Sequence, residues 1–153
     1  MHCQKFLFVI VLLIFTICGT ACNTGPQKPE DFPDLTSCKL KVTQDGSPTE
    51  GIFISALRTD RSREWSIFGV TDANGIATMM TQDKFAGVPE GDYILTMTKQ
   101  ESEPSDTSVT GETTFILLEK KYTNAATSPL RLTVGSEPVK ETYEIGKPVR
   151  LKY

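Results

Sequence analysis

Residues 68–79 read FGVTDANGIATM, and this stretch decides the fold. Asn74-Gly75 predicts a tight turn, because glycine adopts a positive φ at little steric cost and asparagine tolerates it better than most residues. Asp72 can accept a hydrogen bond from the backbone two residues on and start the bend. Apolar residues two apart on either side of the turn share strand faces. We therefore expect two strands joined by this turn, forming the centre of a small β-sandwich.

Short runs of alternating apolar and polar residues recur along the chain, and no stretch has sustained helical periodicity. Turn residues separate the runs, which is typical of an all-β sandwich. Residues 100–112 contain almost no apolar side chain and are predicted to form a loop. The predicted strands are residues 37–44, 51–59, 64–71, 76–81, 92–99, 113–118, 130–134, 141–145 and 149–153.

The first 21 residues have the layout of a secretory signal peptide. A short start with Lys5 as its only basic side chain precedes an apolar run at residues 6–18, and small residues follow. The apolar run is shorter than the roughly 20 residues that span a bilayer comfortably. We therefore expect residues 1–21 to be removed during export.

The sequence GTAC at residues 19–22 resembles the signal of bacterial lipoproteins, although that family usually has leucine where Gly19 stands. The resemblance implies that Cys22 becomes the first mature residue and carries acyl chains such as palmitate. These chains would hold the protein on a membrane of the cell envelope, facing the periplasm or the exterior. Residues 22–35 are rich in proline and are predicted to be a tether, which leaves residues 36–153 for the sandwich. An ordinary cleaved signal peptide and an uncleaved anchor are the alternatives.

The other cysteines bear on whether Cys22 is lipidated. If Cys22 is not lipidated, a Cys22–Cys38 disulfide is the alternative in an oxidising compartment. The pattern around Cys38 favours lipidation, because Cys38, Leu40 and Val42 share one face of a predicted strand. Cys38 is then a small buried hydrophobic residue.

Composition excludes several function classes. The chain has 16 Lys and Arg against 19 Asp and Glu, a net charge of −3 without a basic cluster, so nucleic acid is not an expected partner. The only histidine, His2, lies in the predicted signal peptide. A mature chain without histidine cannot form a Ser-His-Asp site, a Cys-His site or a His-ligated zinc site. We therefore predict no catalytic residue, no metal ligand and no cofactor.

Three sequences in order, DGSP at 45–48, GVTDANG at 69–75 and VPEGDY at 88–93, resemble the carboxypeptidase regulatory-like domain. The pattern is best over residues 38–99. The resemblance implies a seven-stranded, transthyretin-like (prealbumin-like or Ig-like) β-sandwich and a non-catalytic accessory role. The resemblance implies no catalytic residue in this chain, because the motif of the family consists of turn and core positions.

Four residues are candidates for binding. Trp65 shares the phase of Ile67 and lies opposite Phe68 and Val70, so an exposed ring for a sugar or a protein partner is one interpretation and the edge of the core is the other. The remaining three candidates are acids of the predicted loop: Glu101, Glu103 and Asp106.

The sequence leads to one preferred function and two alternatives. The preferred function is a non-catalytic, lipid-anchored module that binds an envelope protein or glycan, or acts as an envelope scaffold. One alternative is a secreted enzyme that uses the loop carboxylates Glu90 and Asp92 on a polymer such as a glycan. The other is a structural envelope protein whose sheet edges pair with another chain.

Overall fold

The computed structural model describes residues 27–60, 65–104 and 112–152. The chain divides into two units, Met1–Glu30 and Asp31–Tyr153, and every strand belongs to the second. Apart from one 3-10 turn, η1 (Lys120–Tyr122), the regular structure in the described residues is strand, so the prediction of an all-β fold is confirmed. These residues include no helix that is long and apolar enough to cross a bilayer.

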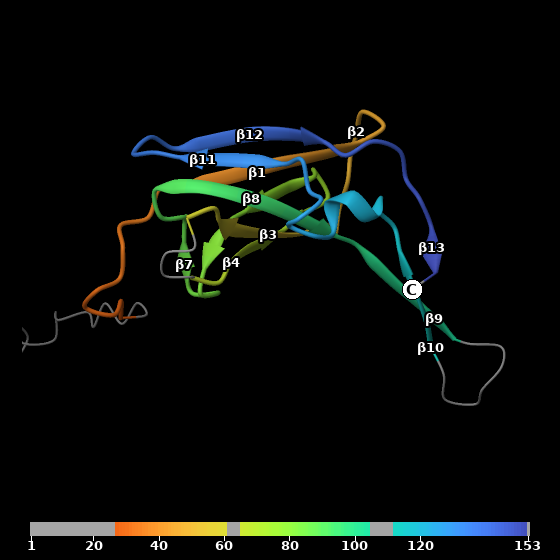
Figure 1. Ribbon diagram of the computed structural model, residues 1–153, viewed down its shortest axis with the longest axis horizontal. Helices are drawn as coiled ribbons and strands as arrows, with labels where there is room; N and C mark the ends of the chain where they lie inside the picture. Colours follow the sequence, from red (N-terminus) through yellow and green to blue (C-terminus); the bar gives the residue numbers. More distant parts are fainter. Residues whose placement is uncertain (1–26, 61–64, 105–111, 153) are drawn as a thin grey trace, which may run out of the picture. The chain divides into compact units, whose positions relative to one another are not determined.

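The first sheet is built around β1 (Cys38–Gln44). β12 (Val139–Glu144) pairs with β1 in parallel along one edge. β2 (Ser47–Pro48) and β5 (Ile76–Thr78) pair with it antiparallel. Figure 1 shows β12 and β1 running side by side, although they come from opposite ends of the sandwich sequence.

The second sheet has the strand order β11–β8–β3–β4–β6–β7, and all of its pairs are antiparallel. In the view of Figure 1, β3 and β4 lie below β1 and β12. Its strands are β11 (Arg131–Val134), β8 (Gly91–Thr98), β3 (Phe53–Arg58), β4 (Ile67–Val70), β6 (Met80–Thr81) and β7 (Phe85–Ala86).

The inward faces of the two sheets form one hydrophobic core, because alternate residues of a strand point to opposite faces. On β8, Tyr93, Leu95 and Met97 are fully buried, as the alternation predicts. The Tyr93 hydroxyl donates to the carbonyl oxygen of Pro89 at 2.7 Å, so the core tyrosine buries no unpaired polar atom. Other fully buried members are Leu40, Val42, Ile52, Ile54, Met79, Val88, Leu118, Leu132 and Ile145.

The turn predicted in residues 68–79 is present. Asp72 Oδ1 accepts the backbone N–H groups of Asn74 at 2.8 Å and of Ile76 at 2.9 Å. Gly75 has a φ of 72°, in the left-handed region that glycine adopts most easily.

The pairing predicted on either side of that turn is only partly confirmed, because the predicted strand at residues 76–81 divides into β5 and β6. β4 pairs with β6, whereas β5 crosses to the other sheet and pairs with β1. The backbone N–H of Met79 then donates to the carbonyl oxygen of Cys38 at 2.9 Å. The segment after the turn therefore pairs with β1, which is far away in sequence.

The buried face of β4 is not the face that carries Phe68 and Val70. Ile67 and Gly69 point into the core, and Phe68 and Val70 point outward. Gly69 fits the crossing of β4 with β5, since a Cβ at this position would lie 2.9 Å from the carbonyl oxygen of Thr78. The close approach of two backbones thus sets which face of β4 is buried.

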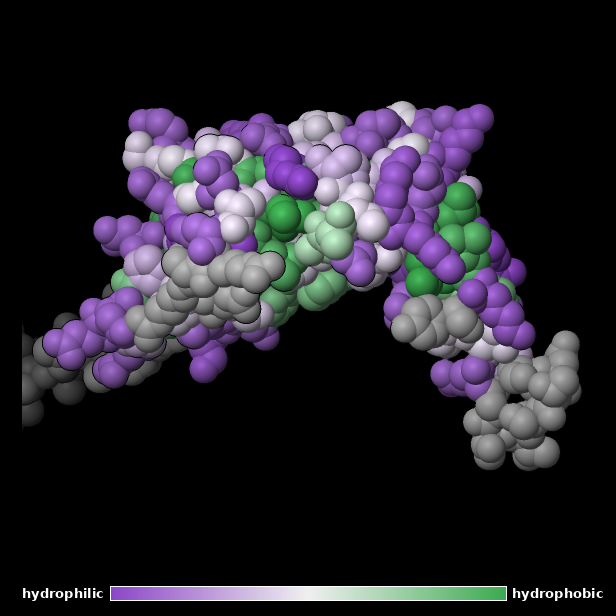
Figure 2. All heavy atoms as spheres, viewed as in Figure 1, coloured by the Kyte–Doolittle hydropathy of each residue, from purple (hydrophilic) through white to green (hydrophobic). Residues whose placement is uncertain are grey.

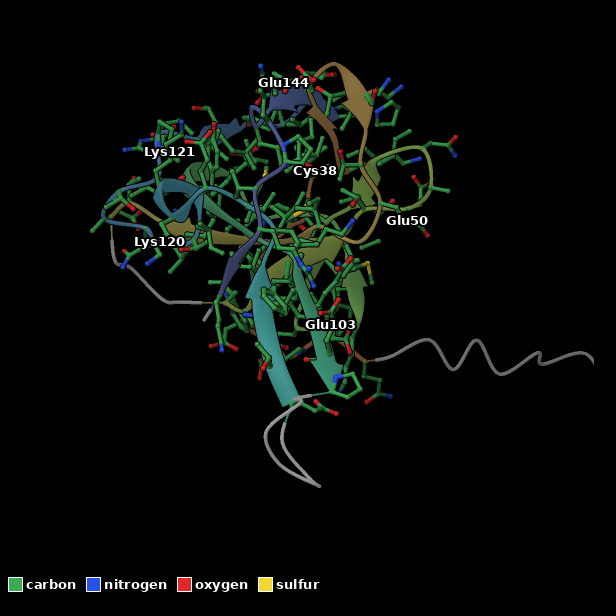
Figure 3. The ribbon with its side chains drawn as sticks, turned by 90° about the vertical axis from the view of Figure 1, so that its right-hand side faces the viewer. Cys38, Glu50, Glu103, Lys120, Lys121 and Glu144 are labelled. Carbon is green, nitrogen blue, oxygen red and sulfur yellow. The ribbon has the colours of Figure 1, made fainter. Side chains whose placement is uncertain are left out.

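A small third sheet has the order β13–β10–β9. Its strands are β9 (Gln100–Pro104), β10 (Glu112–Ile116) and β13 (Leu151–Lys152). The prediction of a loop over residues 100–112 is therefore wrong for 100–104 and 112, and residues 105–111 lie outside the described part. All of β9 is exposed, so it has no apolar face from which its strand could be predicted. Figures 1 and 3 show β9 and β10 leaving the sandwich as a ribbon.

Candidate functional site

The outer face of the second sheet carries a strip of large apolar side chains. Register brings them together, because Phe53 pairs with Val70, Leu57 with Ile94 and Phe68 with Met80. We call the strip the apolar face; its members are Phe53, Leu57, Phe68, Val70, Met80 and Ile94.

Three members of the apolar face are strongly exposed: Phe53 is 42% exposed, Leu57 39% and Val70 54%. Figure 2 shows hydrophobic residues in the middle of the view, over β8 and β3. Scattered apolar side chains are normal on a protein surface, whereas a cluster such as Phe53, Phe68 and Val70, which strand pairing brings together, is typical of an interaction site.

An aromatic pair stiffens the centre of the apolar face. The rings of Phe53 and Phe68 are stacked, with their centroids 5.6 Å apart and their planes 24° apart. Offset stacking at this distance is favourable for aromatic side chains. The pair therefore joins β3 and β4 in one aromatic surface on the outer side of the second sheet.

Two hollows adjoin the apolar face and share Leu57 and Arg58. One, of about 330 Å³, lies between β3 and the residues before β4, with Trp65 and Ser66 in its wall. The other, of about 470 Å³, lies between β3, Ile94 of β8 and the loop at Asn124. Both hollows have polar as well as apolar walls, because Arg58 lines both and Ser55 and Ser66 line the first.

Trp65 is half-buried, and its ring packs against the core. The Phe32 ring contacts it edge-on with centroids 4.9 Å apart, and Phe32 in turn lies 4.6 Å from the ring of Phe85. Trp65 therefore fastens the segment before β1 to the sandwich and lines a hollow with the rest of its surface. Its binding role remains a prediction.

Arg58 separates the two hollows. Its Nε and Nη2 atoms donate to the carboxylate of Asp60, each at 3.2 Å, and its guanidinium lies 5.7 Å from the centroid of the Tyr93 ring. Gly91 makes room for this arrangement, since a Cβ there would lie 2.8 Å from Arg58 Nη2. Arg58 thus supplies a fixed cationic group beside an apolar surface.

The predicted acidic candidates are not brought to Trp65. Glu101 and Glu103 lie on β9, paired with Phe115 and Thr113, and Figure 3 shows Glu103 on the ribbon. Glu103 forms an ion pair with Arg150, whose guanidinium lies 3.9 Å from the centroid of the Phe115 ring. Glu103 is therefore engaged in holding the third sheet together.

Two predicted residues, Asp106 and Cys22, lie outside the described part of the chain.

The carboxylates of the alternative enzyme hypothesis flank Gly91 and are both exposed. Asp92 Oδ1 accepts a hydrogen bond from the hydroxyl of Thr133 at 2.7 Å. Neither Glu90 nor Asp92 lines either hollow beside the apolar face. Within residues 27–60, 65–104 and 112–152, no three carboxylate, cysteine or histidine side chains cluster as metal ligands would.

Sequence reasoning missed the apolar face as a site, although part of its signal was present. Phe53 and Leu57 alternate with the core residues Ile52, Ile54 and Ala56, so their own face is partly apolar. Only the observed register adds Phe68 and Val70 of β4 to that face. The pairing across strands creates the strip.

No protein-family profile matches the chain, and no curated protein is significantly similar to it. Among solved structures, BcpA, the major pilin subunit of Bacillus cereus, matches with a TM-score of 0.46 and 19% identity over 75% of this chain. A variant of BcpA matches with a TM-score of 0.45 and 18% identity over 74% of this chain. The chain spans only 30–31% of the length of these pilin subunits. The β-sandwich described here is defined by its own strand pairing and core.

Proposed function

We propose that this protein is a non-catalytic, extracytoplasmic binding module, anchored to a membrane by lipid at Cys22, whose apolar face docks a protein of the cell envelope. The observation that carries the proposal is the exposure of Phe53, Leu57 and Val70 on one face of a single sheet. Exposure of these apolar side chains to water is unfavourable in free energy. A bound partner would bury them, and burial of apolar surface drives association.

The composition of the apolar face favours a protein over a glycan. Sugars stack on the open faces of aromatic rings, whereas Phe53 and Phe68 stack on each other. The aliphatic side chains of Leu57 and Val70 extend the apolar area beyond that pair. Protein interfaces combine aromatic and aliphatic anchors of this kind with a polar rim, and Arg58 lies at the margin.

Three of the sheet edges in the described residues, β9, β2 and β7, are weaker candidates than the apolar face. β9 has Glu101, Glu103 and Pro104 on a fully exposed strand, and charges with proline discourage pairing with another chain. β2 and β7 have two residues each, which is too short to template a long pairing. These three edges are therefore poor templates for another chain, whereas β12 is a six-residue edge strand of the first sheet.

The membrane attachment is supported by the sequence, through the apolar run at residues 6–18 and the GTAC sequence at residues 19–22. Intact mass measurement of the protein extracted from membranes tests it. A chain that begins at acylated Cys22, and loses its acyl chains in a Cys22→Ser variant, is the expected result. A soluble, unacylated chain would refute the lipid anchor.

Site-specific photocrosslinking tests the docking face. A photoreactive amino acid at position 70, on the apolar face, should give a discrete protein adduct in intact cells. The same amino acid at position 102 is the matched control, because Ser102 is also exposed but lies on β9 of the third sheet. Equal adducts from both positions, or none from position 70, would contradict the proposal.

A further inference from the structure

The outer face of the first sheet has the opposite character to the apolar face. Lys39 and Lys41 point outward from β1, and Lys140 lies directly beside Lys39 on β12. All three side chains are exposed. We call these three residues the basic face. It stands out because the whole chain carries a net charge of −3.

No carboxylate of the described residues forms an ion pair with a lysine of the basic face. The ion pairs in the described part of the chain are Arg58–Asp60, Lys121–Glu119 and Arg150–Glu103, and none includes the three lysines. Like charges side by side on neighbouring strands, about 4.8 Å apart, repel one another. The arrangement therefore favours binding of an external anion.

Two acids of β12, Glu141 and Glu144, keep their negative charge close to the basic face, and each accepts hydrogen bonds from groups other than the lysines. Glu141 lines a hollow of about 360 Å³ between the lysines, and its carboxylate accepts the hydroxyl of Tyr143. Glu144, at the end of β12, accepts hydrogen bonds from the Thr43 hydroxyl and from the N–H groups of the β1–β2 turn. Figure 3 shows Glu144 at that end of the molecule.

An apolar side chain lies among the lysines. Ile76 of β5 pairs with Lys41, is 38% exposed and lines the same hollow. A surface that combines lysines with an apolar side chain suits the boundary between phospholipid headgroups and acyl chains, where lysine stems lie along apolar surface while their ammonium groups reach phosphate.

We propose that the basic face rests on an anionic membrane surface and orients the domain there. This inference rests on the membrane attachment proposed above. β1 is the first strand after the predicted tether. A lipid anchor at the start of that tether would keep these lysines at a high local concentration near the headgroups. Three weak contacts between lysine and phosphate are then enough to orient the domain. The outer faces of a sandwich point in opposite directions, so this orientation leaves the apolar face turned toward a partner.

Lysine footprinting on the full chain tests the orientation. Protein purified from membranes is placed in vesicles of phosphatidylcholine, either alone or mixed with phosphatidylglycerol, and acetylation of each lysine is followed by mass spectrometry. Lys39, Lys41 and Lys140 should react several-fold more slowly on the mixed vesicles, and high salt should restore their reactivity. The internal controls are Lys84, Lys120 and Lys152, whose rates should not change.

A single variant checks that the lysines act together. Lys41→Gln should reduce the protection of Lys39 and Lys140, whereas Lys84→Gln should leave it intact. Because Lys41 and Lys84 are exposed, both variants should fold. Equal reactivity of the basic-face lysines on neutral and anionic vesicles would overturn the orientation alone.

Two further outcomes separate the alternatives. Protection by soluble polyphosphate, but not by anionic vesicles, would assign the basic face to a soluble polyanion and refute the membrane as its partner. A chain that fails to remain with any vesicle would overturn the proposed attachment, and the orientation with it.

Discussion

The carbonyl oxygen of Gly75 accepts the backbone N–H of Val42 at 2.8 Å. This bond joins the turn between β4 and β5 to the middle of β1. The approach is so close that a Cβ on Gly75 would lie 2.5 Å from the carbonyl oxygen of Val42. Gly75 is therefore required for two reasons, its positive φ and the absence of a side chain.

Gly75→Ala should lower the free energy of unfolding by roughly 2–4 kcal/mol, because it combines backbone strain with a collision against β1. Gly46→Ala is the matched control: its φ is 76°, and nothing lies within 4 Å of the Cβ position. That variant should lose only about 1 kcal/mol. Urea unfolding of both variants measures the difference. Equal losses would show that space beside Val42 is not limiting.

Phe53→Ser should abolish the photocrosslinked adduct from position 70 and lower stability by only roughly 1 kcal/mol, because the ring is partly exposed and loses mainly its stacking on Phe68. Phe115→Ser makes the same change at a half-buried position of the third sheet and should leave the adduct intact. Crosslinking yield and thermal unfolding should be measured on the same preparations. A retained adduct in Phe53→Ser would remove the aromatic pair from the docking surface.

Cys38 should be chemically silent in the native protein. It is 1% exposed, and burial, followed by the nearby charge of Glu141, raises the pKa of its thiol to about 12. The thiolate is the reactive form, so at pH 8 alkylation of Cys38 should be slow and limited by unfolding. Peptide mapping with and without urea measures this. Rapid labelling without urea would contradict the buried position.

Glu144→Gln should remove a pH-dependent part of the stability. The Thr43 hydroxyl, at 2.8 Å, and the backbone N–H groups of Gly46, Asp45 and Gly146 hold the pKa of this carboxyl below its usual value of 4.5. A lowered carboxyl pKa contributes stability that is present above pH 4.5 and is lost as pH falls through the folded-state pKa.

The stability difference between wild type and Glu144→Gln should therefore be largest near neutral pH and shrink under acid conditions. Urea titrations across this range measure it. Glu50→Gln, in the exposed turn before β3, controls for the loss of one negative charge. A difference that stays constant with pH would mean that the carboxylate of Glu144 does not stabilise the β1–β2 turn.

Several elements could be predicted because their signal is local. β1 and β8 alternate cleanly, with Leu40 and Val42 in one strand and Tyr93 and Leu95 in the other, and all four side chains are fully buried. β9 gave no such signal, because an exposed strand that is held only by its neighbour has no apolar face.

The candidate site was less predictable than the fold. The sequence singles out Trp65 as an aromatic residue that could bind, but it does not predict the contact with Phe32, which belongs to a segment far away in sequence. Glu103 was recognised as an exposed acid, but its partner Arg150 lies near the other end of the domain. In both cases the residue type can be read from the sequence, but the residue that it contacts cannot.

The sequence by itself determined the all-β class, the positions of most strands and the turn at Asn74-Gly75, because alternation and turn chemistry act between residues close along the chain. Tertiary structure decided which strands pair. It moved β5 to the sheet of β1, turned Phe68 and Val70 outward beside Phe53, and placed Lys140 beside Lys39. The reason is physical: register and sheet membership depend on contacts between distant segments, so both outer faces exist only once the chain is folded.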